Sequence, residues 1–448
     1  LDIIDMSNPA SPVFLTSIAV GGAPTHVQVE GLTVAVSVDR DGGASPGEVR
    51  FYTLGGVFRS AVEVGFLPDQ VTLLNGGTLA LVANEGEPTD GIDPPGSITI
   101  VDRIQSGRPR TCTADFSGIA AGDLDESTRL FPGQSPATDF EPEYVTGVLL
   151  GRFAYAALQE ANAIAEIDIR SCKVTAVRGL GFKDHSLPGN GLDASDRDSA
   201  INIANWPVFG LYQPDTIAAF RDRGEVFIVT ANEGDDRGET ARVGSLALDP
   251  VAFPNAAALR QNANLGRLTV STIEGDDDGD GDYERLFSYG ARSFSIYKST
   301  GEQVYDSGDE FERVTAAAFP EFFNADNEAN TFDNRSDNKG PEPEGVAVGT
   351  IGRQRLAFVG LERIGGVMIY DITDPYAPAF CSYVNSRDFG VGETAFDTDL
   401  APEGLTFVEA RGGSRTPLLF VTNEVSGTVA AFEVSGGECA GVPAGTAD

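Results

Sequence analysis

A two-part phrase recurs along this chain of 448 residues and constrains its fold more than any other feature. The first part is a proline and a polar residue that lead into an apolar run. The second part is another apolar run, which ends in polar and acidic residues such as "VANEGEP", "VTANEGDD" and "FVTNEVSG". The six copies begin at Pro24, Pro68, Pro142, Pro214, Pro343 and Pro402. Repeats of this kind are typical of solenoids and propellers.

Each copy continues with a third strand-like run, and most add a fourth. The many short runs of Val, Ile and Phe, with 53 glycines and 25 prolines, favour strands and tight turns over helices. Four antiparallel strands repeated along a chain are the blades of a β-propeller. The opening "LDIIDMSNPASPVFLTSIAV" matches the second half of a unit, "VMIYDITDPYAPAFCSYV". We therefore predict an all-β, seven-bladed β-propeller with long loop insertions on one face.

The repeat also sets the expected boundaries. We expect a single domain over residues 1–448, with a partial blade at 1–22 and further residues upstream that supply its missing strands, unless ring closure does so. The predicted blades are residues 23–66, 67–111, 140–183, 213–307, 342–385 and 401–435. The predicted insertions are residues 104–139, 184–212, 236–288, 308–340 and 386–400. Every insertion falls in a link that emerges on the same face of a propeller, so this face should carry the function.

Acidic residues flank the same two links of each repeat. They are Glu85, Glu143, Glu160, Asp215, Glu233, Glu344, Glu362, Glu403 and Glu424. If they converge near the mouth of the central channel, their mutual repulsion requires cations or hydrogen-bond donors between them. We predict that they bind metal. The alternative is that each one pairs with an arginine or caps a turn.

The insertion at 236–288 contains "DDDGDGDYE", which has the spacing of a calcium loop. In this spacing alternate carboxylates point at one centre and a glycine makes the sharp turn. The residues that fit are Asp276, Asp278, Asp280 and Gly281, and Asp282 or Glu284 could complete the shell. Position 12 is Phe287, so we expect an isolated loop and not a helix-flanked EF-hand. A solvated acidic turn is the alternative.

Two other insertions place basic residues beside carboxylates. "GFKDHSLPGNGLDASDRD" contains Lys183, Asp184 and His185, and "FDNRSDNKGPEPEG" contains Arg335 and Lys339. A metal and a neighbouring cation together can neutralise the oxygens of a phosphoryl group, so this pairing suits phosphoester chemistry. Salt bridges that only pin long loops are the alternative.

The formal charge of −36 makes nucleic acid and anionic membranes improbable partners, because both would be repelled. Cations are the expected partners, although an acidic surface can also serve solubility alone. The chain has no apolar run of about 18 residues, so we expect no membrane span.

Four cysteines are spread singly, with no C-x-x-C spacing. A zinc cluster is therefore not expected, and two disulfides in an exported protein are, with buried free thiols as the alternative. Because the cysteines follow strands of neighbouring predicted blades, we predict the pairs Cys112 with Cys172 and Cys381 with Cys439.

The phrases "LQEANAIAEID", "GFKDHS", "TANEGDDR", "RSDNKGPEPEGVAVG" and "LERIGGVMIYDITDP", in this order, resemble the choice-of-anchor I family of secreted β-propellers. The resemblance covers nearly the whole chain. The family includes exported bacterial proteins, some described as atypical alkaline phosphatases, and similar domains occur in mesenchyme-specific cell-surface glycoproteins. It implies a secreted or surface-anchored, calcium-linked protein.

The family motifs also imply functional residues. They are Glu160, Lys183, Asp184, Asn232, Glu233, Arg335, Asp337, Lys339, Glu344, Glu362, Arg363, Glu403 and Glu424. The usual "EE-RV" motif departs to "GETARV" here, so that only Glu239 of its two acids remains.

Two classes of function fit these observations. The leading one is a metal-dependent phosphoester hydrolase that uses Ca²⁺ or a second divalent metal to activate water. Its candidate catalytic residues are Lys183, Asp184, His185, Arg335, Lys339 and Arg363. The alternative is a non-catalytic calcium-binding module of a cell surface, matrix or extracellular filament, which binds ions or a partner. The chain has only two histidines, so a Ser/His/Asp triad is not supported.

Overall fold

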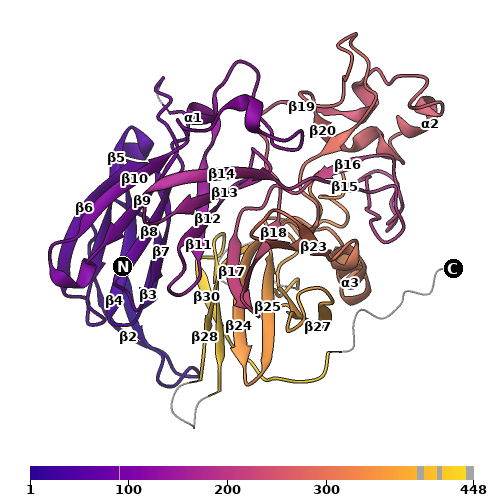
Figure 1. The fold of residues 1–448 in the computed structure, drawn as a ribbon. Helices are drawn as coiled ribbons and strands as arrows, with labels where there is room; N and C mark the ends of the chain where they lie inside the picture. Colours follow the sequence, from indigo (N-terminus) through magenta and orange to yellow (C-terminus); the bar gives the residue numbers. More distant parts are fainter. Residues whose placement is uncertain (90, 391–397, 411–415, 440–448) are drawn as a thin grey trace. The chain divides into compact units, whose positions relative to one another are not determined.

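The computed structural model describes residues 1–89, 91–390, 398–410 and 416–439 (Figure 1). It has two compact units. Unit 1 consists of residues 1–179 and 219–226, and unit 2 of residues 180–218 and 227–448. The repeats in both units form antiparallel sheets, so the all-β prediction is confirmed.

Unit 1 contains one two-stranded and three four-stranded sheets. The pair is β1 (Asp2–Asp5) with β2 (Val13–Ser17). The next sheet has β3 (Ala23–Glu30), β4 (Thr33–Arg40), β5 (Ser45–Tyr52) and β6 (Phe58–Phe66). The others are β7 (Pro68–Leu74), β8 (Leu79–Asn84), β9 (Ser97–Asp102) and β10 (Arg110–Asp115), then β11 (Pro142–Gly147), β12 (Phe153–Leu158), β13 (Ala163–Asp168) and β14 (Lys173–Gly179).

Unit 2 continues the repeat with three sheets. Residues 219–226, at the hairpin between the first two strands of the first of these sheets, are counted with unit 1. The first has β17 (Ile217–Asp222), β18 (Glu225–Asn232), β22 (Ser293–Lys298) and β23 (Gln303–Asp306). The second has β24 (Pro343–Ile351), β25 (Gln354–Leu361), β26 (Val367–Asp371) and β27 (Ala379–Val384), and the third has β28 (Pro402–Val408), β29 (Leu418–Asn423) and β30 (Thr428–Glu433). The strands begin and end close to where the repeated phrases predict.

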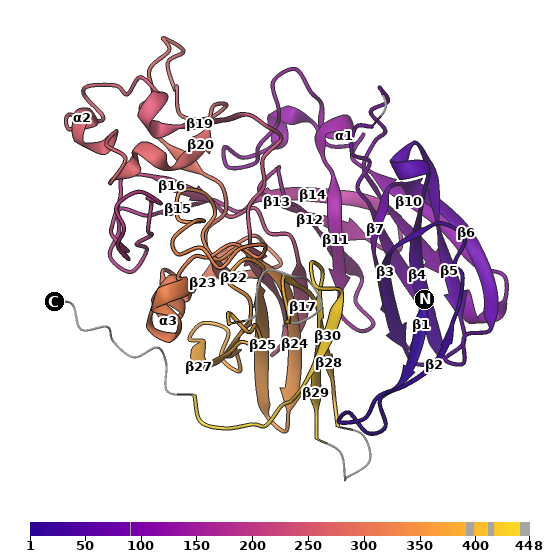
Figure 2. The same cartoon turned by 180° about the vertical axis from the view of Figure 1, so that it is seen from behind.

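The predicted insertions are not all irregular. Segments from 184–212 and 236–288 join β15 in a five-stranded sheet (Figure 2). Its strands are β15 (Phe182–Asp184), β16 (Phe209–Leu211), β21 (Phe287–Ser288), β20 (Thr269–Ser271) and β19 (Thr240–Arg242). The physical reason is a core of their own, in which Leu192, Val243, Leu265 and Val270 are almost completely buried. Strand β10 also lies entirely within a predicted insertion, 104–139, where it pairs with β9 as the fourth strand of its sheet.

Helices are few and short in the described part of the chain. They are α1 (Pro136–Asp139), α2 (Ala256–Leu259) and α3 (Glu310–Ala318), with 3-10 helices at Asp41–Gly43, Ile104–Ser106, Ala121–Asp123, Val243–Ser245, Leu265–Arg267 and Pro320–Phe322. None of the described helices has the length and apolar character needed to cross a membrane.

Both predicted disulfides form. Cys112 in β10 is bonded to Cys172 in the turn after β13, 60 residues away, within unit 1. Cys381 in β27 is bonded to Cys439, 58 residues away, within unit 2. Each bridge joins neighbouring repeats or the segment that follows the last one, as the repeat predicts.

Candidate cation-binding site

The first strand of most repeats contains a bulge directly after its proline. Strand pairing shifts register between Pro68 and Gln70, Pro142 and Val145, Pro343 and Val346, and Pro402 and Leu405. Proline has no amide proton for the ladder, so a bulge at this place is expected. Since a bulge re-aims side chains, it takes the residue after each proline out of the regular strand alternation. These residues are Asp69, Glu143, Glu344 and Glu403.

The bulge brings this acid to the same sheet end as the acid that follows the second strand. Pro343 lies opposite Leu361, so Glu344 and Glu362 are both at this end. One backbone hydrogen bond recurs here. Its donor is the amide of the acid that follows the second strand, or of the next residue, and its acceptor is the carbonyl of the residue before the proline. It joins Glu85 to Leu67 at 2.9 Å, Gly234 to Gln213 at 3.0 Å, Glu362 to Glu342 at 2.8 Å and Glu424 to Ala401 at 2.8 Å.

The residue before the proline has a left-handed backbone in four repeats. The φ angles are 43° at Leu67, 40° at Gln213, 50° at Glu342 and 60° at Ala401. Such angles cost non-glycine residues about 1–2 kcal/mol each, and strained backbone of this kind clusters at functional sites. The sequence does not reveal this feature, because none of the four residues is glycine.

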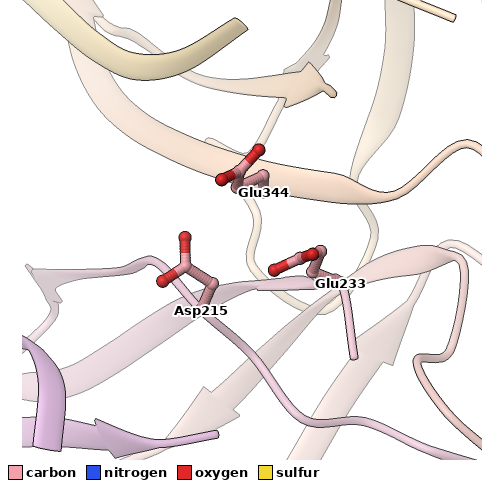
Figure 3. Close-up of side chains that lie close together, drawn as sticks. All are labelled: Asp215, Glu233 and Glu344. Atoms are coloured by element: carbon pink, nitrogen blue, oxygen red, sulfur yellow. The ribbon is translucent and has the colours of Figure 1, made fainter. Parts of the chain in front are cut away.

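Three of the predicted carboxylates meet in unit 2. Asp215 precedes β17, Glu233 follows β18 and Glu344 lies in the bulge of β24 (Figure 3). One oxygen from each lies within 4.8 Å of the others. Three such oxygens suit a hard divalent cation such as Ca²⁺, which binds carboxylates in flexible geometry.

Glu344 has both a buried oxygen without a described partner and a raised pKa. Its Oε2 atom is buried and has no hydrogen-bond partner in the described structure. Burial raises the pKa of Glu344 well above 4.5, and the negative charges of Glu233, Glu362, Asp215 and Glu403 raise it further. A carboxylate here is therefore stable only with a proton or a cation beside it.

A second acid, Glu342, sits beside the trio in the opposite environment. Its side chain is 0% exposed and contacts three cations: Arg335 at 2.5 Å, Arg363 at 2.9 Å and Lys339 at 3.2 Å. Burial alone would raise the pKa of Glu342, but these three charges lower it to about 2. Lys339 also pairs with Glu233 at 2.8 Å and so links the two environments.

Glu362 extends this network. Glu233, Glu342 and Glu362 each offer an oxygen within 4.8 Å of the others. Glu362 pairs with Arg363 at 3.1 Å and accepts a hydrogen bond from Asn327 Nδ2 at 2.8 Å. Burial and the neighbouring acids raise its pKa to about 8. Glu342 and Asn327 were not among the predicted site residues. Glu342 stands inside the quoted "RSDNKGPEPEG" motif, whereas no motif singles out Asn327.

The predicted calcium loop folds as a compact acidic turn in unit 2. Asp276, Asp278 and Glu284 form a group with oxygens within 4.8 Å, and so do Asp249, Asp282 and Glu284. The amides of Gly279 and Gly281 donate to Asp276 at 2.8 and 3.1 Å. Asp280 belongs to neither group. Asp249 is a member that the loop spacing could not predict, because it comes from another segment.

In unit 1 the carboxylates Glu85, Glu143 and Glu160 do not form a trio of this closeness in the described residues. Burial raises the pKa of Glu85 to about 9, with further contributions from Asp69 and Glu160 among other acids. The acids are thus near enough to interact. In unit 2, Glu403 acts on Glu344 through its charge, whereas Glu424 is exposed and belongs to none of the described close groups.

The basic insertion residues have structural contacts. Lys183 is 2% exposed, and its ammonium group donates to the Ala291 and Gly308 carbonyls at 2.9 and 2.5 Å and pairs with Asp306 at 3.0 Å. His185 is 1% exposed, and its Nδ1 lies 2.7 Å from the Asn190 carbonyl.

Other residues of the insertions also have contacts that are structural. Asp184 accepts hydrogen bonds from the amide and hydroxyl of Ser186. Asp337, which the family motifs also suggest, pairs with Arg242 and Arg267. None of these described contacts joins the Asp215–Glu233–Glu344 trio, whereas Lys339 does.

Repeated antiparallel sheets of three or four strands with acid-lined ends define an all-β repeat protein. The chain belongs to the family of the Choice-of-anchor I domain, whose profile matches residues 1–375. The family resemblance in the sequence is thereby confirmed.

Two animal proteins are related to it. Gigasin-3a of Magallana gigas is 36% identical over 193 residues, which are 40% of this chain and 68% of that protein. A mesenchyme-specific cell surface glycoprotein of Strongylocentrotus purpuratus is 28% identical over 221 residues, again 40% of this chain. The match spans only 28% of that glycoprotein's length.

Among solved structures, a Lactobacillus plantarum protein has a TM-score of 0.45 at 9% identity and covers 96% of this chain and 90% of its own. The β-propeller domain of Myceliophteria thermophila Cps50 (Swd1) has a TM-score of 0.36 at 10% identity and covers 94% and 99%.

Proposed function

We propose that this chain is a calcium-binding domain of an extracellular or cell-surface protein. The observation that carries the proposal is the Asp215, Glu233 and Glu344 trio, whose oxygens lie within 4.8 Å of one another. Lys339 pairs with Glu233 at 2.8 Å, and the charges of Glu233 and Asp215 disfavour a charged Glu344. Ca²⁺ would supply the missing charge, with Glu344 Oε2 as a ligand that otherwise has no described partner.

The proposed extracellular or cell-surface location of the protein is supported by independent observations. Two disulfides are typical of proteins that fold in oxidising compartments, and one relative carries the name of a cell surface glycoprotein. Extracellular fluids are also rich in calcium, so a weak site would be occupied there. The acidic loop at Asp276 to Glu284 offers a second place for the same ion.

Calcium should raise the thermal stability of the protein, and a chelator should lower it. At a free Ca²⁺ concentration of about 100 times Kd, binding to one site adds about 2.7 kcal/mol to the free energy of unfolding. Melting wild type, Glu344→Gln and Asp278→Asn with Ca²⁺ or with chelator checks this. We expect each variant to lose part of the calcium-induced shift, because each removes one ligand charge.

The chelator arm separates binding from folding damage. Glu344→Gln removes a buried charge that burial disfavours, so its midpoint in chelator should equal or exceed that of wild type. A calcium-induced shift that is absent in wild type, or unchanged in both variants, would contradict the proposal.

Metal-dependent phosphoester hydrolysis is the second candidate, and Lys339 is the observation that favours it. Its ammonium group lies 2.8 Å from Glu233, so a cation stands next to the carboxylate trio. A metal bound there would polarise a phosphoryl oxygen and activate water. Lys339 would compensate charge on the substrate, as would Arg363, which is partly exposed.

A generic phosphomonoester assay across divalent metals tests this candidate. If the trio is catalytic, wild type turns over with at least one metal, and Glu344→Gln loses at least 100-fold of the rate, or about 2.7 kcal/mol of transition-state stabilisation. Lys183→Met serves as a comparison, because Lys183 lies in other contacts. Absence of turnover with every metal removes the hydrolase and leaves the binding domain.

We also propose that the repeats form a seven-bladed propeller. Six repeats have three or four strands each, and β1 with β2 supplies the outer half of another. The likeness of residues 1–20 to β26 and β27 supports this assignment of the half blade. An experimental structure with a number of blades other than seven would refute it.

A further inference from the structure

A group of buried acids in unit 2 lies outside the site described above. It is made of Asp193 in the loop after β15, Glu312 in α3, and Asp333 in the segment after the last 3-10 helix. These side chains are 0%, 1% and 2% exposed. The segments come from two different insertions, so the group joins parts of the chain that are far apart in sequence.

Hydrogen bonds hold this group together. Glu312 Oε2 accepts from the Asp193 amide at 2.9 Å, and Glu312 Oε1 accepts from Asn324 Nδ2 at 3.0 Å. The same Asn324 Nδ2 donates to Ser336 Oγ at 2.8 Å, and Ser336 Oγ donates to Asp333 Oδ1. Asn324 and Asp333 are therefore neighbours through one hydroxyl group.

Two oxygens in this group are left without partners. Asp333 Oδ2 and Asn324 Oδ1 are both buried and make no hydrogen bond to any residue that the structure describes. Asn324 is 0% exposed. Leaving a buried polar atom without a hydrogen-bond partner is unfavourable, because its lost hydration is not replaced. Two such acceptors, next to one shared hydroxyl, point to a ligand that offers positive charge.

The charge balance leads to the same ligand. Among the residues that the structure describes, one cation has an ion pair with the group: Arg292, which is 4% exposed and pairs with Glu312 at 2.5 Å. Three carboxylates and one guanidinium leave two negative charges when all are ionised. Burial and the neighbouring acids raise the pKa of Asp193 to about 7 and that of Asp333 to about 8, and Asp198 contributes to both. Only protons or a divalent cation can remove this excess charge.

We propose that Asp333 Oδ2 and Asn324 Oδ1 bind a divalent cation inside unit 2, with Asp193 and Glu312 as its charge-balancing neighbours. Every available donor is a carboxylate, amide or hydroxyl oxygen, which favours Ca²⁺ over softer metals. Water and the partly exposed Asp198 can complete the shell. The cation would tie the loop after β15 to the segment after α3, and would thus stabilise the insertions. The site shares no residue with the carboxylate trio or the acidic loop.

Trp206 provides a reporter. It is the only tryptophan of the chain, and its indole nitrogen donates to the Leu192 carbonyl at 3.1 Å, directly before Asp193. Terbium bound at this site should therefore be sensitised by indole excitation. Tyr283 of the acidic loop packs against the same hydrophobic cluster as Trp206, so a loop variant is needed to separate the two sites.

The main variant is Asp333→Asn. Asp333 has a φ of 66°, a left-handed conformation that asparagine adopts readily, so the backbone should tolerate the change. We expect wild type to bind one Ca²⁺ more than Asp333→Asn in calorimetry. We also expect Asp333→Asn to lose at least half of the Trp206-sensitised terbium emission, and the control Asp278→Asn to lose less than Asp333→Asn does.

If protons or water, and not a cation, satisfy the buried oxygens, the Asp333→Asn experiment gives a different result. Asparagine is isosteric with a neutral acid, so Asp333→Asn would then leave stoichiometry and emission unchanged, which overturns the proposal. If the variant does not fold, a wild-type crystal grown with Mn²⁺ decides. An anomalous peak between Asp333 and Asn324 supports the site, and a map without one refutes it. Loss of binding in Glu344→Gln or Asp278→Asn alone would concern the proposed function and not this site.

Discussion

Replacement of Glu342 by glutamine should lower the free energy of unfolding by about 3–5 kcal/mol, because removing one partner leaves buried charges uncompensated. Glu342 is 0% exposed and neutralises Arg335, Arg363 and Lys339 at distances of 2.5 to 3.2 Å. Glutamine keeps the size of the side chain but removes its charge. Urea unfolding at neutral pH, followed by circular dichroism, measures the effect.

The pH dependence gives a second readout. The pKa of Glu342 is about 2, below its usual value of 4.5. A lowered pKa means that this contribution to stability is present above the unfolded-state pKa and is lost as pH falls from about 4.5 towards 2. The glutamine variant should therefore show less loss of stability in this window than wild type does.

An exposed ion pair is the matched control. Glu302 pairs with Lys298 at 2.8 Å, but its side chain is 61% exposed. Glu302→Gln should cost less than about 1 kcal/mol, as exposed pairs do. If Glu342→Gln were as mild as this control, the interpretation of Glu342 as the centre of the cation network would be wrong.

The sheets could be predicted from the sequence because the repeat shows them many times. A proline, a polar residue and an apolar run state the same local rule in each copy, and a bulge at the proline follows from its missing amide proton. The pairing of Cys112 with Cys172 followed from the same order of strands. Local rules that recur are therefore readable without a structure.

The distinction between Glu342 and Glu344 could not be predicted. The two residues are two positions apart, which on a regular strand would place them on one face. In the structure Glu342 precedes β24 with a φ of 50°, and the bulge follows Pro343. One acid therefore meets three cations and the other faces carboxylates. The difference depends on the bulge and on the contact of Glu342 with Arg363, 21 residues away in the sequence, neither of which the spacing of the two acids encodes.

The contacts of residues in the insertions could not be predicted from the sequence either. Lys183 and His185 stand in a conspicuous motif, yet their described contacts are with backbone carbonyls and Asp306. Their predicted catalytic role stays a prediction. Asp333 stands in the quoted "FDNRSDNKGPEPEG" phrase, but Asn324 lies outside it, and the two become neighbours through the hydroxyl of Ser336.

Loss of the Cys112–Cys172 disulfide should be the other large effect. The bridge closes a separation of 60 residues, and a disulfide of this kind stabilises by about 2–4 kcal/mol, mainly by restricting the unfolded chain. Cys112 is exposed and Cys172 is half-buried, so a Cys112→Ser, Cys172→Ser double variant loses little packing. Denaturant unfolding under non-reducing conditions should show a lower midpoint.

The second bridge supplies the control for this experiment. Cys381–Cys439 spans 58 residues in unit 2, so chain entropy predicts a similar contribution. A reductant should therefore lower the midpoint of wild type by more than that of the double variant, which retains only one bridge to lose. Since serine has the same left-handed penalty as cysteine at position 172, where φ is 54°, backbone strain cannot explain the loss. Equal midpoints for wild type and double variant would mean that this bridge restricts nothing in the unfolded chain.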